Sequence, residues 1–247
     1  MKLGIDLTSL SDRFGGMQYY ARSLSEAIIR QFSGEISLYL PGLGDVDDHL
    51  NDEHVEAVEV PFPDGSRVVA EQLFLPALTG FGAVDRLLVP AYLGPVMSPV
   101  PVDFIVYDFL YLDQRSGLSA KQRMYWKLFY RRTFHQAENL FPISHTVGRE
   151  IHDHFPGLGH KVGPVLYPGQ PRRKPIVQLT SGQQENTRPP YILFVGNISP
   201  RKNVGKLIEW YKQYSGKGAG EFDLRLVGGL GWGGFDRSTL HQPESGI

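Results

Sequence analysis

Two positively charged side chains follow an apolar run near the end of the chain and could bind a phosphate group. The sequence there is YILFVGNISPRKN (191–203), in which Gly196 ends the run and Arg201 and Lys202 precede an amphipathic segment. Glycine lets a backbone approach a ligand closely, and cations beside a helix N-terminus favour an anion. We predict that Arg201 and Lys202 bind a diphosphate and stabilise it as it leaves. The alternative is solvated surface charge, the usual state of these residue types.

A pair of glycines near the start of the chain has a similar character. Gly15 and Gly16 follow the loop after the first apolar run and precede a segment with helical spacing. Two glycines allow backbone N–H groups to point at an anion, so we expect a phosphate contact there. An ordinary turn before a helix is the equally open alternative.

Three further polar side chains follow predicted strands. Asp108 comes after the apolar run 104–106 and could accept a hydrogen bond from a substrate hydroxyl, or cap the next segment. Tyr107 beside it is the second residue that we predict for the catalytic site, although it cannot be a base at neutral pH, because a tyrosine pKa is about 10. Ser144 follows the run 140–143 and could contact a phosphate or another domain, or cap a helix.

The elements that would position these residues alternate between strand and helix. Apolar runs predict strands, and apolar positions at helical spacing predict helices between them. This alternation indicates a parallel α/β sheet of the Rossmann-like type. We expect domains at 1–170 and 191–247, joined by a proline-rich and polar linker at 171–190. The predicted strands lie at residues 2–7, 35–40, 55–60, 86–89, 104–106, 140–143, 161–166, 191–195 and 224–227, and the predicted helices at 17–28, 67–78, 119–137, 147–155 and from 203.

Composition limits the classes of protein to consider. The chain has 247 residues, a formal net charge of -1 and no cysteine. Near-neutral charge gives no reason to expect nucleic-acid binding, and the lack of cysteine excludes disulfides and thiol nucleophiles. No apolar run approaches the roughly 18–20 residues that span a bilayer. The eight histidines show no metal-ligand spacing, so we expect no metal site. A cytoplasmic protein is our expectation.

These motifs resemble the retaining glycosyltransferases of family 4, which have the GT-B fold of two Rossmann-like domains. The family's second domain opens with a strand and a G-x-x-x-P-R-K-N loop, and this chain has GNISPRKN at 196–203. VGGLGW at 227–232 is similar to the end of the family's next strand. EQLFLP at 71–76 and VPAYLGP at 89–95 look like members that build bacterial polysaccharides. The resemblance covers almost the whole chain.

The resemblance implies a sugar transfer from a nucleotide-diphosphate sugar to a saccharide or lipid-linked acceptor. It places the donor diphosphate against Arg201, Lys202 and Gly196, with the Gly15–Gly16 loop closing over it. It places the acceptor in the first domain, with Asp108 near the reacting centre. No cofactor or metal is implied, because cationic side chains and helix N-termini replace a divalent ion.

The chain departs from the family pattern at two points. The family's E-x7-E motif, which contacts the donor sugar, has no room before the last residue, and the family's His-Asp pair is Tyr107–Asp108 here. We therefore predict little or no transferase activity for this chain. The alternative is a truncated, non-catalytic protein that binds a glycan or a partner protein, and its apolar surface could pair with another copy.

The segment KQRMYWKLFYRR (121–132) mixes cations with aromatic residues on a predicted helix. The cations Arg123, Lys127 and Arg131 form one stripe, and we expect Met124 and Leu128 to face elsewhere. Such a helix could make a peripheral contact with anionic lipid at the inner face of a membrane. The alternative is a solvated face with long aliphatic stems that cover a core helix.

Overall fold

The structure is a computed structural model of residues 1–247. The chain divides into two compact units, one made of Met1–Phe109 and Met124–Arg172, the other of Leu110–Arg123 and Arg173–Ile247. Of the predicted linker, only residue 190 is described, so the predicted domain boundaries stay predictions. The structure describes residues 1–10, 15–42, 50, 52–62, 67–80, 82–112, 118–169, 190–199, 202–215 and 222–229.

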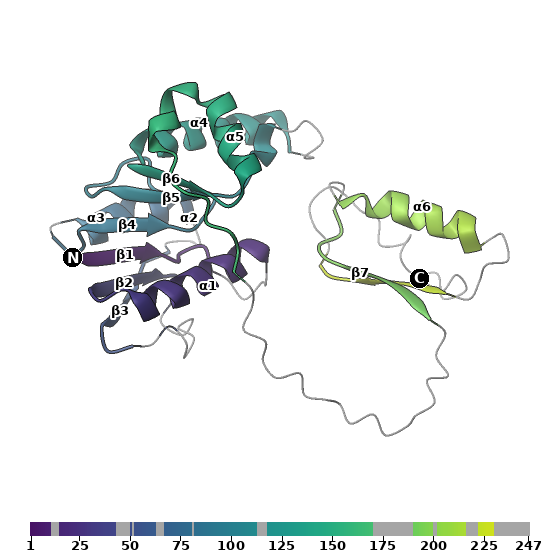
Figure 1. The fold of residues 1–247 in the computed structure, drawn as a ribbon, viewed down its shortest axis with the longest axis horizontal. Coiled ribbons are helices and arrows are strands. Elements are labelled where there is room, and N and C mark those ends of the chain that lie inside the picture. The colour runs from purple at the N-terminus through teal and green to yellow at the C-terminus, as the bar shows by residue number, and fades with distance from the viewer. Residues whose placement is uncertain are drawn as a thin grey trace, which may run out of the picture. The chain divides into compact units, whose positions relative to one another are not determined.

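The first unit is built on a six-stranded sheet whose strands are all parallel, as the alternation of strands and helices predicts (Figure 1). The strand order is β3-β2-β1-β4-β5-β6. The chain moves outward from β1 to β3, then continues at β4 on the other side of β1. The order of the strands therefore reverses between β1 and β4. The strands are β1 (Lys2–Asp6), β2 (Glu35–Leu40), β3 (Val55–Glu59), β4 (Arg86–Val89), β5 (Val102–Val106) and β6 (Asn139–Pro142).

Helices cover both faces of this sheet. The 16-residue helix α1 follows β1, and the 17-residue helix α4 precedes β6. Ser119 caps α4, because the Gln122 amide donates to Ser119 Oγ over 3.2 Å and Ser119 N donates to Gln122 Oε1 over 2.9 Å. Between residues 16 and 161 of the described chain, the helical elements are α1 (Gly16–Gln31), α2 (Arg67–Val69), η4 (Ala70–Phe74), α3 (Leu75–Thr79), η5 (Leu110–Leu112, which belongs to the second unit), α4 (Ala120–Gln136), α5 (His145–His154) and η7 (Pro156–Lys161).

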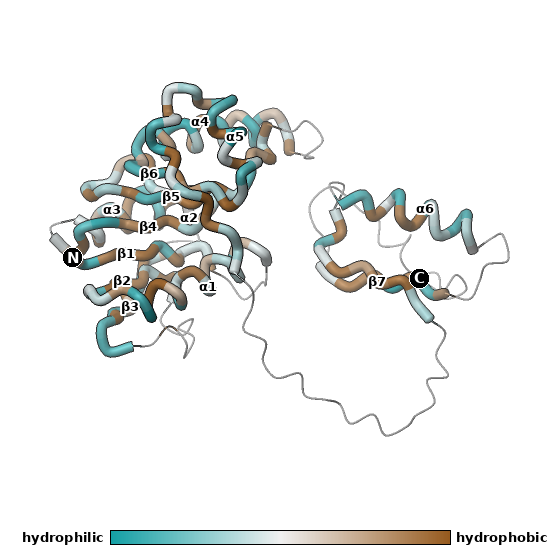
Figure 2. The backbone as a smooth tube through the Cα atoms, viewed as in Figure 1, coloured by the Kyte–Doolittle hydropathy of each residue, from teal (hydrophilic) through white to brown (hydrophobic). Residues whose placement is uncertain are grey.

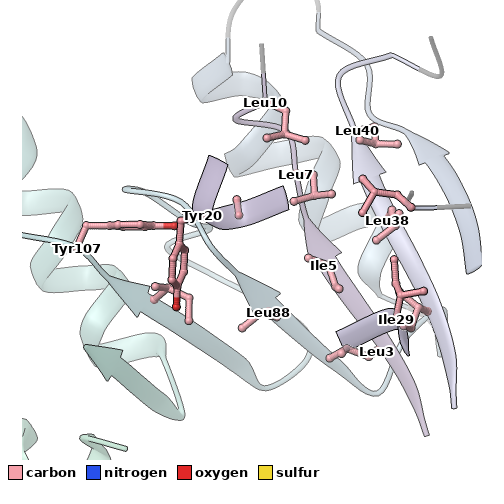
Figure 3. Close-up of a cluster of buried hydrophobic side chains, with 14 residues drawn as sticks. Leu3, Ile5, Leu7, Leu10, Tyr20, Ile29, Leu38, Leu40, Leu88 and Tyr107 are labelled. Atoms are coloured by element: carbon pink, nitrogen blue, oxygen red, sulfur yellow. The ribbon is translucent and has the colours of Figure 1, made fainter. Parts of the chain in front are cut away.

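One face of the sheet packs against α1. Alternate residues of a strand point to the same face, so Leu3, Ile5 and Leu7 share one side. They pack with Tyr20 and Ile29 of α1 in a buried cluster that Figure 3 shows. Burial of large aliphatic side chains stabilises a fold by roughly 1.5–3 kcal/mol each. This cluster therefore fixes α1, and its N-terminus, against β1.

The other face packs against α4 through aromatic rings. Phe104 of β5 lies 5.6 Å from Phe134 and 6.5 Å from Tyr130, measured between ring centroids, with edge-on or tilted geometry. Such arrangements stabilise aromatic pairs beyond their buried area. The ring of Phe155, just after α5, also contacts Phe134 at 5.2 Å. The aromatic layer joins β5, α4 and the end of α5.

A π-helical turn interrupts the helix predicted at 67–78. The Leu75 amide donates to the Ala70 carbonyl, five residues back, so Ala70–Phe74 forms η4 between α2 and α3. Within η4, Gln72 Nε2 donates to the Gly94 carbonyl over 3.0 Å and Gln72 Oε1 accepts from Val96 N over 2.8 Å. These two hydrogen bonds hold the loop that follows β4 against η4.

The predicted strand at 161–166 is wrong. Only Val162 makes an isolated bridge, with Leu140 of β6. Gly163 donates to the Leu140 carbonyl and Leu166 to the Pro142 carbonyl, three residues apart instead of two. A regular strand returns to the same face every two residues, so this spacing breaks the register.

The second unit contains β7 (Tyr191–Val195), α6 (Val204–Ser215) and β8 (Asp223–Val227), with the two strands parallel. Ile208, Tyr211 and Leu224 form its buried core. The opposite face of the sheet is apolar and exposed, and Figure 2 shows β7 as a hydrophobic strand. The exposed fractions are 51% for Leu193, 70% for Val195, and 53% for Val227.

Candidate functional site

Gly15 and Gly16 lie at the N-terminus of α1, as the sequence predicts. Gly15 is extended (φ -142°, ψ 158°), a conformation that any residue adopts. A Cβ added at either glycine would meet no atom of the described chain within 4 Å. Neither conformation nor packing within the described residues therefore requires glycine. Because glycine has no side chain, Gly15 and Gly16 place no side-chain atoms over the first N–H groups of α1.

The charge at this helix end favours an anion. The first turn of α1 contains no acidic residue, and the N-cap residue, Gly15, makes no side-chain cap. The partial positive charge of the helix dipole is therefore not offset by a carboxylate of that turn. Tyr20, one turn along, donates from its hydroxyl to the Leu166 carbonyl over 2.9 Å, and burial raises the pKa of Tyr20 to about 12. Tyr20 is therefore a neutral structural residue at neutral pH.

The loop after β1 holds buried polar side chains that sequence reasoning missed. Asp6 is fully buried at the end of β1, and Thr8 donates to its Oδ1 from both N (3.0 Å) and Oγ1 (2.6 Å). Ser9 is 6% exposed, and its hydroxyl makes no hydrogen bond within the described residues. This loop lies where the strand order reverses, which is the usual ligand position in open α/β sheets. The sequence signal that could have identified this loop was the run of polar residues at the end of the first apolar strand.

Tyr107 is buried at the end of β5. Its hydroxyl donates to the Pro90 carbonyl over 3.0 Å, and its ring lies edge-on to Tyr20 at 5.5 Å (Figure 3). Burial raises the pKa of Tyr107 above its usual value, which strengthens the prediction that it is not a base. The geometry gives Tyr107 a packing role, and a catalytic role for it stays a prediction.

Asp108, which follows Tyr107, is half-buried at the same strand end. Tyr92 donates from its hydroxyl to Asp108 Oδ2 over 3.0 Å. The Tyr92 ring also contacts Tyr107 at 5.2 Å and Trp126 at 6.3 Å. Sequence reasoning missed Tyr92 because its partner is 16 residues away along the chain. The hydrogen bond from Tyr92 therefore fixes how the Asp108 carboxylate, which accepts hydrogen bonds at both oxygens, is oriented.

Ser144 begins α5. Its Oγ accepts a hydrogen bond from Val147 N over 3.2 Å, the geometry of a helix N-cap. The helix-cap interpretation of Ser144 is therefore confirmed. Its predicted contact with a phosphate or another domain stays a prediction.

In the second unit, two glycines bring the ends of β7 and β8 close together. Gly196 has φ +150° and Gly228 has φ +148°, both strained for any residue with a side chain. A Cβ at Gly228 would lie 2.1 Å from the Gly196 carbonyl oxygen. Gly196 N donates to Val227 O and Ile198 N to Gly229 O, each over 2.9 Å. The segments that follow β7 and β8 are therefore hydrogen-bonded to each other and form one edge of the sheet.

Lys202 lies beside that edge, in the turn before α6. Its side chain is exposed, and its amide donates to the Ser199 carbonyl over 3.0 Å. Asn203 next to it has φ +54°, in the left-handed region that asparagine tolerates. Arg201, the other predicted phosphate ligand, lies outside the described residues. Among the predicted donor-site residues of this unit, Gly196 and Lys202 share one sheet edge.

The predicted residues thus fall in two places. Gly15, Gly16, Asp108 and Ser144 lie at the carboxyl edge of the six-stranded sheet, because every strand there is parallel and ends on that side. Gly196 and Lys202 lie at the corresponding edge of the second unit. No group of three or more histidine and acidic side chains among the described residues is placed to hold a metal ion. None of the helices in that part of the chain is long and apolar enough to cross a bilayer.

Comparison with solved structures shows what this architecture resembles. HepE of Anabaena, solved in complex with UDP and glucose, matches with a TM-score of 0.56 at 11% identity, over 92% of this chain and 70% of that chain. Two weaker similarities have TM-scores of 0.47 and 0.48. They are the lipopolysaccharide outer core galactosyltransferase WaaB (12% identity, 92% of this chain, 68% of that chain) and UGT2 of Phytolacca americana (13%, 99%, 68%).

No family model matches the sequence, and no curated protein matches it. At 11% identity the similarity to HepE concerns the fold alone. The predicted fold class is confirmed: the first unit is a parallel α/β domain with a six-stranded Rossmann-like sheet, and the chain is similar in fold to HepE.

Proposed function

We propose that this chain comes from a glycosyltransferase that uses a nucleotide-diphosphate sugar as its donor. The observation that carries the proposal is the edge of the second unit. Gly196 and Gly228 leave bare backbone there, and Lys202 supplies a positive charge at the start of α6. Bare backbone, a cation and a helix N-terminus together suit a diphosphate. The similarity of fold to HepE, which was solved with UDP and glucose, supports the same assignment.

The first unit would hold the acceptor in this scheme. Asp108 would accept a hydrogen bond from the attacking hydroxyl, with Tyr92 orienting the carboxylate. The N-terminus of α1 at Gly15 and Gly16 would contribute to binding the donor phosphates. Family 4 membership, retention of anomeric configuration and a role in bacterial polysaccharide synthesis rest on the sequence motifs. The acceptor would be a saccharide or a lipid-linked saccharide.

Calorimetric titration with UDP, GDP and ADP tests the donor site directly. We expect at least one nucleoside diphosphate to bind, and the double substitution Arg201→Ala with Lys202→Ala to weaken it. Loss of charge-assisted hydrogen bonds costs about 1.5–3 kcal/mol, a rise in Kd of roughly 10- to 150-fold. Lys206→Ala is the matched control, because Lys206 is an exposed cation of α6 outside the loop.

The competing hypothesis is a non-catalytic protein that binds a glycan or a partner. It predicts no heat of binding with any of the three nucleotides. Equal weakening by Lys206→Ala would also contradict a specific diphosphate site, because it would indicate only general attraction between opposite charges.

A further inference from the structure

The outward side of α4 combines positive charge with exposed apolar side chains. Tyr130 and Phe134 face the core and are buried. On the opposite side, Met124 is 71% exposed and Leu128 is 53% exposed. Residues three and four apart on a helix are neighbours, so Leu128 lies beside Met124, Arg131 and Arg132. We call Met124, Lys127, Leu128, Arg131 and Arg132 the α4 outer face.

The positive charges of this face are not neutralised locally. Helix α4 contains no aspartate or glutamate over Ala120–Gln136. Lys127, Arg131 and Arg132 make no ion pair or side-chain hydrogen bond with the part of the chain that the structure describes. Other cations of this unit do pair, as Arg86 does with Asp103. The α4 outer face is thus a concentrated positive patch on a chain whose net charge is -1.

The apolar side chains of the α4 outer face distinguish between two possible partners, a nucleic acid and an anionic bilayer. Phosphate groups on a nucleic acid would match Lys127, Arg131 and Arg132, but would leave Met124 and Leu128 in water. An anionic bilayer satisfies both kinds of side chain, since cations contact headgroups and apolar side chains enter the boundary with the acyl chains. Figure 2 shows that α4 contains hydrophilic stretches. We propose that the α4 outer face docks on an anionic lipid bilayer, independently of the proposed donor site.

Vesicle binding by the full chain tests this proposal. We expect co-sedimentation with vesicles of phosphatidylcholine and phosphatidylglycerol (about 7:3), and little with phosphatidylcholine alone. Each cation near an anionic surface contributes about fivefold in affinity, so Arg131→Gln with Arg132→Gln should weaken binding roughly 25-fold. Raising salt to about 0.5 M should release the protein, because screening shortens the range of the attraction.

The matched control removes the same charge elsewhere. Arg149→Gln with Lys206→Gln changes two exposed cations outside the α4 outer face and should leave vesicle binding within about twofold. Circular dichroism verifies that each variant is folded. Equal losses in the two double variants, or equal binding to neutral vesicles, would overturn the proposal.

A fluorescent label can measure directly whether the apolar side chains of the α4 outer face enter the bilayer. The chain has no cysteine, so Leu128→Cys creates a unique site for an environment-sensitive fluorophore. Its emission should shift to the blue on anionic vesicles, whereas a label introduced by Gln213→Cys on α6 should not shift. An unshifted label at position 128, or binding to a single-stranded RNA without binding to vesicles, would contradict lipid docking.

Discussion

Gly228 stands where two strand ends approach each other so closely that no side chain fits. Its φ of +148° and the nearby Gly196 carbonyl both exclude a Cβ. Neither condition can be inferred from composition, since the sequence has 28 glycines and, among those that the structure describes, φ is positive at Gly82, Gly196 and Gly228 only. The residue therefore fixes the geometry of the proposed donor edge without contacting a ligand.

Replacing Gly228 should destabilise the second unit. We expect Gly228→Ala to cost about 2–4 kcal/mol, since backbone strain and a steric clash add. Hydrogen exchange of the Gly196 and Ile198 amides, which donate to Val227 and Gly229, should accelerate accordingly. Gly229→Ala is the control, because its Cβ would meet only Asn197 Oδ1 at 3.7 Å. Unchanged exchange in Gly228→Ala would show that the two strand ends separate easily.

Individual site residues were predictable to different degrees. Asp108 and Ser144 follow apolar runs, so their position at strand ends could be inferred from the sequence. Tyr92 could not, because its hydrogen bond to Asp108 depends on how β4 and β5 lie side by side. Pairings of this kind are properties of the sheet and leave no local pattern.

At the scale of elements, α5 has a side-chain cap at its start. Ser144 Oγ accepts a hydrogen bond from Val147 N. Ser144→Ala should lower the free energy of unfolding by about 1 kcal/mol, measured by urea titration. Ser144→Asp should restore most of it, because aspartate caps equally well. Equal loss in both variants would mean that the cap does not matter.

The strands were largely predictable, and the errors have physical causes. Buried parallel strands read as continuous apolar runs, so β1, β2 and β4 stand out. The run at 161–166 is also largely apolar, but among the described residues it pairs only with β6, and it loses register after Gly163. The π-turn at Ala70–Phe74 was also missed. A single turn of this kind is too short to change the apolar spacing by which a helix is recognised.

At the scale of the whole molecule, buried phenols should limit alkaline stability. Burial raises the pKa of Tyr20 from 10 to about 12. Between these values the folded chain keeps the phenolic proton and the unfolded chain loses it. Stability is therefore intact below pH 10 and falls as pH rises toward 12, by up to about 1.4 kcal/mol per pH unit for this group.

Urea unfolding at pH 8, 10 and 11.5 measures this loss. Other groups titrate in the same range, so the informative quantity is the difference between the wild-type chain and Tyr20→Phe. We expect Tyr20→Phe to lose less stability than the wild type between pH 10 and 11.5. Parallel losses in the two proteins would place the alkaline sensitivity in other groups.

The two hydrogen bonds of Gln72 make the position of the loop after β4 depend on the number of residues in the helix before it. The backbone hydrogen bond of η4 joins residues five apart, whereas an α-helical hydrogen bond joins residues four apart. In this arrangement the Gln72 side-chain amide bonds to both Gly94 and Val96. Excising any one residue of Ala70–Phe74 would swing the preceding helical residues by about 100° and detach the amide from that loop. Natural insertions and deletions should therefore be tolerated before residue 67 far more readily than within this single turn.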